Sequence, residues 1–229
     1  MVSVSQPARL YRGIEPSERR AQRRERLLDA GLEVFGTQGY AGSSIRIVSA
    51  AASLNSRYFY ESFTDREDLL YYVYKRIVSE VAAAVVEVTT QAETIEEQAY
   101  EGLRAAWTIL TEDPRKARVL ALEVVGVSDR LERFRRENRH AFADILLQNS
   151  RAITGDLTGL DPVLTARSLM GAVLDLLVDW INGDLDATVE QIVEHFTRLF
   201  TAVVDAAISQ EPATARPRRR RKAARSAPS

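Results

Sequence analysis

The sequence predicts an all-α fold of about nine helices. Apolar residues recur at helical spacing over most of the chain, and no stretch alternates apolar and polar residues as a half-buried strand does. The eleven glycines and seven prolines fall mostly between these periodic segments. Several segments begin with a residue that can cap a helix, so the sequence also predicts where the helices start.

Three helices are expected in the first 63 residues, after a flexible arm over residues 1–16. The first covers residues 17–36 and buries apolar side chains at helical spacing, namely Leu28, Leu32 and Phe35. A short helix from Ser44, a turn over residues 52–54 and a second short helix from about Asn55 follow.

Capping residues mark the later helices. Thr64–Glu67 and Thr94–Glu97 have the pattern of capping boxes, in which side chains satisfy the free N–H groups at a helix start. Asp113-Pro114 and Asp161-Pro162 place a capping residue before a proline at the first helical position. With these starts, the expected later helices cover residues 64–90, 94–110, 114 onward, 128–154, 162–182 and 187–208.

Composition excludes several classes of protein. The chain has 229 residues, 45% of them hydrophobic, and can bury a core. It has no cysteine, and two histidines are too few to suggest a metal centre. No apolar run reaches the roughly 18 residues that span a bilayer, and the N-terminus lacks the apolar region of a secretion signal. We therefore expect a cytoplasmic protein with no metal, no cofactor and no membrane partner.

The segment over residues 43–63, SSIRIVSAAASLNSRYFYESF, carries the functional signal. Two short amphipathic helices joined by a tight turn and held on a third helix form a helix-turn-helix, whose second helix can enter the DNA major groove. The apolar side chains expected to face inward are Ile45, Val48, Leu54, Phe59 and Phe63. Those left outside are Ser56, Arg57, Tyr58, Tyr60 and Glu61.

An exposed arginine flanked by aromatic residues is typical of a binding surface. Arg57 can contact guanine with two hydrogen bonds, which discriminates by about 1–3 kcal/mol. A purely structural helical hairpin is the alternative.

Charge is distributed unevenly along the chain. The net charge is +3 over residues 1–63, −11 over residues 64–215 and +7 over residues 216–229. Basic ends favour a polyanionic partner, with an ordinary solvated surface as the alternative. The segment 211–229 is expected to be a disordered basic tail that either adds salt-sensitive affinity for DNA or has no defined role.

Five arginines crowd the start of the first helix, where cations oppose the helix dipole. The sequence leaves two explanations open: these arginines lie near a DNA backbone, or they form local ion pairs with Glu18 and Glu25. The five are Arg19, Arg20, Arg23, Arg24 and Arg26.

Residues 23–70 resemble the DNA-binding domain of the TetR family without a gap. The shared features are Phe35 before Gly39-Tyr40, the Ser44-Ile45-Arg46 run, the Tyr60-x-x-Phe63 ending and the acidic Glu67-Asp68-Leu69 start of the next helix. The family often has glycine in the turn where this chain has Ser53, so the turn is either strained or built differently.

The resemblance implies roles for individual residues. Bases would be read by Ser56, Arg57 and Tyr58, and phosphates would be held by Ser44, Arg46, Tyr60 and Arg66. The resemblance also implies a dimer in which the last two helices of each subunit form a four-helix bundle. The apolar residues expected there, with a core inside one subunit as the alternative, are Leu169, Val173, Leu177, Trp180, Ile192, Phe196, Leu199, Phe200 and Val203.

A ligand site is expected in the C-terminal domain. Tyr100, Arg104 and Trp107 lie at i, i+4 and i+7 on one helix face, a mixture typical of an apolar pocket with one cationic group. Phe134 and His140 from a later helix complete the expected site. Core packing or surface pairing is the alternative for each residue.

The sequence thus predicts a DNA-binding domain over residues 17–63 and a ligand-binding and dimerisation domain over residues 64–210. The expected function is a sequence-specific transcriptional regulator, a homodimer on palindromic double-stranded DNA, acting as a repressor released by a small-molecule effector. A DNA-binding protein without an effector is one alternative. A helical enzyme is another, but no nucleophile–base pair, phosphate loop or metal-ligand spacing supports it.

Overall fold

The structure is a computed structural model that describes residues 15–154 and 160–209. These residues form nine α-helices and one π-helical turn, with no strand, which confirms the predicted fold class. The expected basic tail, and the expected arm up to residue 14, lie outside them. No described helix is long and apolar enough to cross a membrane. The elements in chain order are α1 (Pro16–Gly42), α2 (Ile45–Ala51), α3 (Ser56–Tyr60), α4 (Arg66–Thr89), α5 (Ile95–Glu112), α6 (Pro114–Arg118), η1 (Val119–Glu123), α7 (Asp129–Thr154), α8 (Pro162–Asn182) and α9 (Val189–Ser209).

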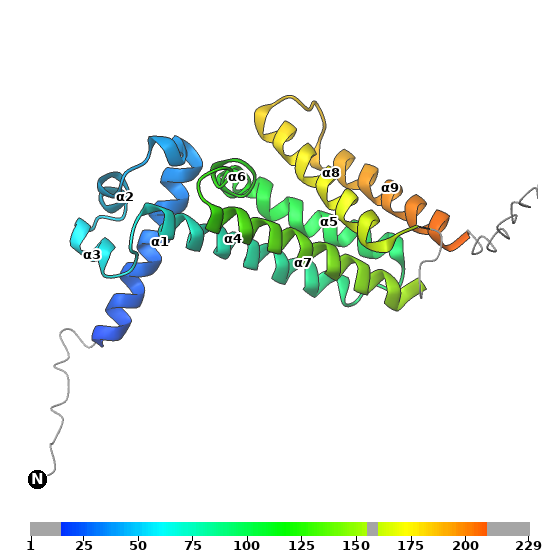
Figure 1. The fold of residues 1–229 in the computed structure, drawn as a ribbon, viewed down its shortest axis with the longest axis horizontal. Coiled ribbons are helices and arrows are strands. Elements are labelled where there is room, and N and C mark those ends of the chain that lie inside the picture. The colour runs from blue at the N-terminus through cyan, green and yellow to red at the C-terminus, as the bar shows by residue number, and fades with distance from the viewer. Residues whose placement is uncertain (1–14, 155–159, 210–229) are drawn as a thin grey trace, which may run out of the picture.

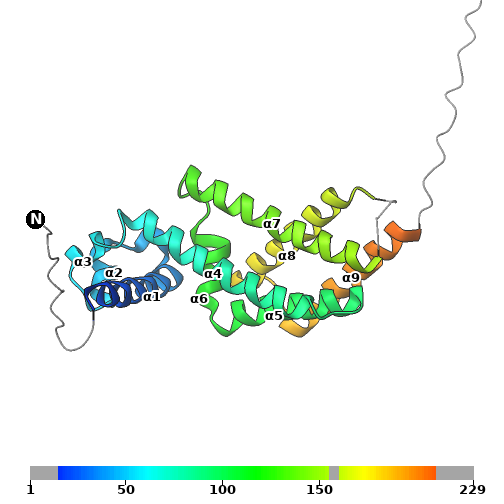
Figure 2. The ribbon, with the colours of Figure 1, turned by 90° about the horizontal axis from the view of Figure 1, so that it is seen from below.

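The helices form a small head and an elongated bundle (Figure 1). Helices α1, α2 and α3 make the head, and α4 runs from the head into the bundle. In the bundle, α5 packs between α4 and α9, whereas α8 packs mainly against α7. The view from below shows the same order, with α7 and α8 crossing on the side away from α5 (Figure 2).

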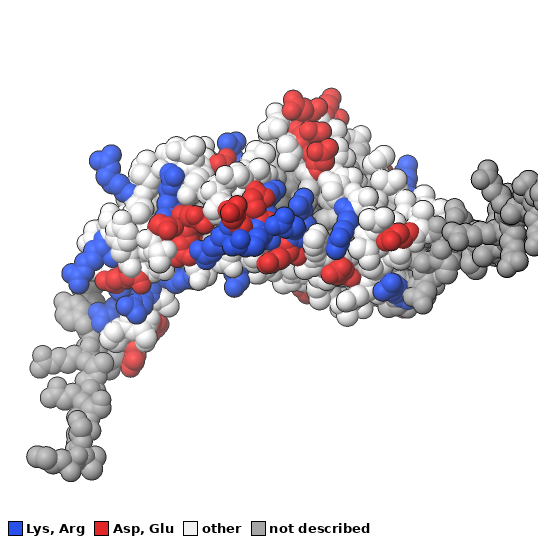
Figure 3. All heavy atoms as spheres, in the orientation of Figure 1, with Lys and Arg blue, Asp and Glu red and all other residues white. Residues whose placement is uncertain are grey.

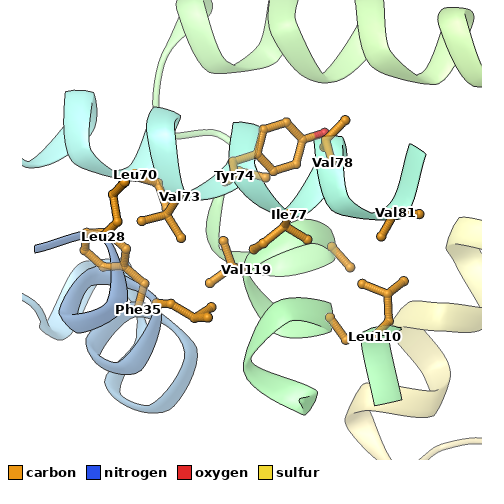
Figure 4. Packing of buried hydrophobic residues seen from close by; sticks show 14 of the residues in the cluster. Leu28, Phe35, Leu70, Val73, Tyr74, Ile77, Val78, Val81, Leu110 and Val119 are labelled. Atoms are coloured by element: carbon orange, nitrogen blue, oxygen red, sulfur yellow. The ribbon is translucent and has the colours of Figure 1, made fainter. Parts of the chain in front are cut away.

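One apolar core joins the head to the bundle. Leu28 and Phe35 of α1 meet Leu70 and Val73 of α4, and the fully buried Val119 of η1 lies beside them (Figure 4). The burial of Leu28, Leu32 and Phe35 confirms the predicted apolar face of the first helix. Because head and bundle share this core, a change in the packing of one alters the packing of the other.

The predicted helix starts are confirmed at five positions and wrong by one residue at a sixth. Ser44, Asn55, Thr94, Asp113 and Asp161 each accept a hydrogen bond at the start of their helix; the start from Asn55 had been placed only approximately. The start of α4 is capped by Asp65 and not by Thr64: Asp65 Oδ1 accepts from Asp68 N–H at 2.8 Å. Asp68 Oδ2 in turn accepts from Thr64 N–H at 3.3 Å. Asp is the stronger capping residue, which accounts for the shift.

Helix α1 continues beyond the predicted end at Gly36. Glycine is needed there for close packing, since a Cβ at Gly36 would overlap Arg115 at the start of α6. The helical conformation is interrupted instead at Gly39, where φ is 78° and ψ is 158°. Essentially only glycine adopts this region, so Gly39 sets the direction in which the chain leaves α1 for α2.

Candidate nucleic-acid interface and ligand cavity

The turn between α2 and α3 is braced from behind by α1. Ser53 in this turn has a φ of 52°, the left-handed conformation that glycine adopts without strain. Arg26 of α1 donates from Nη2 to the carbonyl oxygens of Ala52 and Ser53, at 2.6 and 3.3 Å. Of the two alternatives for a turn without glycine, strained or built differently, the structure shows the strained one. The guanidinium of Arg26 holds the carbonyl groups of this turn.

Helix α3 has one buried face and one open face. Phe59 and Phe63 are buried together with Val48 of α2, as predicted, and Ile45 and Leu54 are half-buried. On the open face, the Tyr60 ring is 62% exposed and the Arg57 side chain is 85% exposed. Arg46 of α2 is also exposed, and Ser56 is half-buried. The structure thus brings the predicted base-reading residues and Arg46 to an accessible end of the molecule.

Tyr58 of α3 and Glu61, the residue after this helix, are held by one residue of α1. Arg23 Nη2 donates to Glu61 Oε2 at 3.2 Å, and its guanidinium lies over the Tyr58 ring at 4.6 Å. Glu61 Oε1 also lies 3.8 Å from Arg57 Nε. The two neighbours of Arg57 in the reading face are therefore fixed by the head's own contacts.

Arg24 and Arg23 do not pair with the local acids that the sequence suggested. Arg24 lies between the rings of Phe63 and Tyr72, 4.9 and 4.5 Å from their centroids. Glu25 instead faces Arg76 of α4, at 3.6 Å. Together with Arg26, three of the five crowded arginines hold the head together, through contacts too distant in sequence to be predicted.

Arg66 lies differently from the expectation of a phosphate contact. Its Nη1 donates to the carbonyl of Tyr40 at 2.9 Å, to the carbonyl of Ser43 and to Ser43 Oγ at 3.2 Å. The guanidinium also covers the Tyr40 ring at 4.1 Å. Arg66 fastens the start of α4 to the link between α1 and α2. Ser44, another expected phosphate contact, caps α2 through its Oγ, which accepts from Ile47 N–H at 3.2 Å.

The bundle encloses a cavity of about 370 Å³ between α4, α5, α7, α8 and α9. Its size falls within the range of small-molecule sites, and its walls are mostly apolar. The α5 residues that line it are Gln98, Ala99, Gly102, Leu103, Ala106 and Leu110.

The structure does not bring the predicted ligand residues together around this cavity. None of the five lines the cavity. The Tyr100 hydroxyl donates to Glu190 Oε1 at 2.9 Å, and Arg104 pairs with Glu101 at 2.6 Å. Trp107 is buried edge-to-face against Trp180, Phe134 packs on Tyr71 and Tyr74, and His140 is half-buried outside the lining. Both faces of α5 carry apolar residues, and the face toward the cavity is set by packing against α4 and α9.

Polar side chains lie at two places in the cavity wall. Thr89, Gln98 and Asn149 form one group, and Asn149 Nδ2 donates to Thr89 Oγ1 at 3.3 Å. Tyr74, Arg135, Asn138 and Arg139 form the other. Burial raises the pKa of the Tyr74 phenol to about 12, although the nearby Arg135 and Arg139 act in the opposite direction. No cluster in the described ranges has the side chains to hold a metal ion.

The π-helical turn η1 connects the cavity to the head. Leu120 and Ala121 line the cavity from this turn. Two residues on, Glu123 Oε2 accepts from the backbone N–H of Tyr40 at 2.6 Å, and Glu123 Oε1 lies 2.8 Å from Arg118 Nε. A second link is the ion pair between Arg115 of α6 and Glu33 of α1. One short segment thus touches both the cavity and the link between α1 and α2.

Four of the nine residues expected at a dimer interface are buried inside one subunit. Leu177, Ile192, Phe196 and Phe200 are at most 7% exposed in the single chain, so the predicted bundle stripe is corrected to an intramolecular core at these positions. Leu169, Val173, Trp180 and Val203 are half-buried, and Leu199 is 39% exposed. The most apolar face of α9 packs against α5 of the same chain.

Comparison with known proteins agrees with the head's geometry. Residues 27–73 match the family model of bacterial regulatory proteins, tetR family. The HTH-type transcriptional repressor NicS of Pseudomonas putida is 26% identical over 153 residues, which cover 66% of this chain and 66% of that protein, just under two thirds of its length.

Solved structures share the fold over a longer stretch. The fatty acid degradation regulator FadR from Bacillus halodurans superposes with a TM-score of 0.70 at 18% identity, covering 78% of this chain and 94% of that one. FadR from Bacillus subtilis, in complex with stearoyl-CoA, gives 0.70 at 20% identity over 77% and 96%. A regulator from Pseudomonas aeruginosa gives 0.70 at 18% identity over 85% and 94%. The helix-turn-helix at the N-terminal end thus matches the tetR family of bacterial regulatory proteins, and the chain shares its fold with solved transcriptional regulators.

Proposed function

We propose that the protein is a homodimeric repressor that binds a palindromic operator through α3 and leaves it when a small molecule occupies the bundle cavity. The observation that carries this proposal is the open face of α3, where Arg57 and Tyr60 project from a braced helix-turn-helix. The repressor NicS among the relatives supports the sign of regulation. The DNA-binding domain is taken as residues 17–63 and the ligand-binding and dimerisation domain as residues 64–210.

The proposed DNA contacts are chosen by the exposure of the side chains on the helix-turn-helix and by their place at its helix starts. Ser56, Arg57 and Tyr58 read base edges, because they lie on or beside the open face of α3. Arg46, Tyr60 and Ser44 hold phosphates on either side. Arg66 is left out, since its guanidinium already donates to Tyr40 and Ser43.

The proposed dimer uses the outer faces of α8 and α9. A single five-residue recognition helix reads too few bases for an operator, so two copies about 34–36 Å apart are required. Exposed apolar residues lie on both helices: Leu164 on α8, and Leu199, Ala202 and Ala206 on α9. This surface replaces the buried stripe that the sequence suggested.

The proposed release passes through η1. A ligand that displaces Leu120 and Ala121 from the cavity wall also moves Glu123, which holds Tyr40 between α1 and α2. The ligand shifts the protein only by its difference in affinity for the two conformations. The stearoyl-CoA complex of Bacillus subtilis FadR supports a small-molecule ligand, because that protein has the same fold.

Selection of bound sequences from random DNA tests the proposal. We expect the wild type to enrich a palindrome, Arg57→Ala to lose the preference at one base position while keeping salt-sensitive binding, and Arg133→Ala at an exposed position of α7 to select as the wild type does. Failure of the wild type to enrich any sequence, or an unchanged preference in Arg57→Ala, contradicts the assignment of α3.

A further inference from the structure

The cavity has two polar ends separated by an apolar length. Helices α4 and α7 run in the same direction, as the contacts Ser128–Glu67 at one end and Asn149–Thr89 at the other show. Arg139 and Asn149 both line the cavity from α7 and are ten residues apart. At the helical rise per residue, this separation is about 15 Å. Between them the walls are apolar side chains, among them Phe142, Ile145 and Leu146.

Gln98 marks the inner end. The residue is 4% exposed and lines the cavity, and its Oε1 is buried without a hydrogen-bond partner in the described structure. Its polar neighbours do not supply a hydrogen: the Thr89 hydroxyl donates to the Val85 carbonyl, and Asn149 Nδ2 donates to Thr89. Buried carbonyl groups are nearly always paired, and an unpaired one costs about 1–3 kcal/mol. A donor from a bound molecule therefore fits this position.

Arginines mark the outer end, on the rim formed by α7. Arg139 is exposed and forms no ion pair with the described residues, although it lies close enough to Glu132 to help lower the pKa of that carboxyl; Arg135 is paired with Glu132 at 2.9 Å. Both guanidinium groups lie close enough to the Tyr74 phenol to act on its pKa. Asp175 of α8 is the one acidic residue among those that line the cavity in the described ranges. Basic side chains gather over the first half of α7 on this face of the molecule (Figure 3).

We propose that the cavity binds an elongated, single-chain amphiphile with an anionic group at Arg139 and a hydrogen-bond donor, a hydroxyl or amide, at Gln98 Oε1. The inference rests on the proposed function for the consequence of binding, and it adds the chemical class of the ligand. The apolar middle of the cavity holds the chain of the ligand. Gln98 then selects among molecules of equal length by the group at their buried end.

Calorimetric titration with two probes tests the buried end. Dodecanoate and its ω-hydroxy derivative share one chain and one carboxylate and differ in a single donor. We expect wild-type protein to bind the ω-hydroxy acid about tenfold more tightly, because only that probe satisfies Gln98 Oε1. Gln98→Met keeps an unbranched side chain of similar length without the carbonyl. It is expected to bind plain dodecanoate at least as tightly as the wild type, which also shows that the variant is folded, and to lose the preference.

An equal affinity of the wild type for both probes, or a preference that survives in Gln98→Met, overturns the role of Gln98. The methyl ester of the ω-hydroxy acid tests the other end. It should bind the wild type at least tenfold more weakly than the acid, and Arg139→Gln should reduce acid binding to the level of the ester. Arg133→Gln is the control, since Arg133 lies on the same helix, is exposed and does not line the cavity. An ester that binds as tightly as the acid overturns the anionic end.

Operator binding is measured in parallel to separate the two proposals. If the wild type enriches an operator but binds neither acid, the ligand class is wrong and the DNA-binding function stands. If the ω-hydroxy acid binds with the expected preference but leaves the operator complex intact, the site stands and its role in release is wrong.

Discussion

Glu123 in the π-helical turn accepts a hydrogen bond of 2.6 Å from the backbone N–H of Tyr40, where α1 gives way to α2. The carboxylate is 11% exposed and also faces Arg118. The Glu123 side chain therefore pairs with the free N–H of Tyr40 in the head. Its backbone belongs to the turn η1, whose residues Leu120 and Ala121 line the ligand cavity.

Removal of this carboxylate should destabilise the protein. In Glu123→Ala the Tyr40 N–H loses its partner, and the free energy of unfolding should fall by about 1–3 kcal/mol. Glu123→Gln keeps an acceptor but not the charge facing Arg118, so its loss should be smaller. Urea unfolding measures both, with Glu112→Ala as control because Glu112 is exposed. Equal stability of Glu123→Ala and Glu112→Ala would mean that the hydrogen bond contributes nothing measurable.

Gly39 should resist substitution, whereas Gly42 should accept it. At Gly39 a side chain meets both the positive φ of 78° and Glu123 Oε2, 3.1 Å from the added Cβ. Gly39→Ala should therefore cost about 1–3 kcal/mol or more. Gly42, three residues later, has open space around it, and Gly42→Ala should be neutral or stabilising by up to about 1 kcal/mol. Thermal unfolding of the pair gives the comparison, and similar losses in both would argue against strain at Gly39.

Ser53 should be improved by glycine. Its φ of 52° is left-handed, which costs an ordinary residue about 1–2 kcal/mol relative to the right-handed conformation. Ser53→Gly should raise the free energy of unfolding by about 0.5–1 kcal/mol, and Ser53→Ala should not. The two variants are compared by denaturant midpoint, and a destabilised Ser53→Gly would show that the serine side chain contributes more than the strain it causes.

Tyr74 should make the protein sensitive to alkali. Burial raises its folded-state pKa to about 12, above the ordinary 10.0 of a tyrosine phenol, so the unfolded chain loses the phenolic proton first as the pH rises. Stability from this residue is intact below pH 10 and is lost progressively up to pH 12, to a total of about 2–3 kcal/mol. Tyr74→Phe lacks the titrating group and should lose less stability over this range. Urea unfolding at several pH values decides, and parallel curves for the two proteins would contradict the raised pKa.

Most of the helix boundaries could be predicted because they depend on neighbouring residues. Asn55, Asp113 and Asp161 cap their helices by accepting from N–H groups two or three residues on, and such local chemistry is visible in the sequence. The prediction was wrong where two residues compete locally, as Thr64 and Asp65 do. It was also wrong where a distant contact decides, as at Gly36, which is glycine because Arg115 packs against it.

The reading face and the cavity differ in how well they could be predicted. Phe59 of the very short helix α3 and Phe63 just after it are the apolar residues there, so the open face carrying Arg57 follows directly. In α5, by contrast, Trp107 and Ala106 belong to two different apolar faces, and only the positions of the packed helices decide which face borders the cavity. The α9 stripe was correctly predicted to be buried, but periodicity does not distinguish a partner helix in the same chain from one in a second subunit.

The contact of Arg23 with Tyr58 and Glu61 has an entropic consequence for DNA binding. Those two side chains are already held in the free protein, so the cost of ordering them is met during folding and does not fall on association. Arg57, which is 85% exposed beside them, still has its rotamer freedom to lose. The reading face therefore combines a rigid frame with one adaptable side chain, and changes in operator preference should arise most easily at that single position.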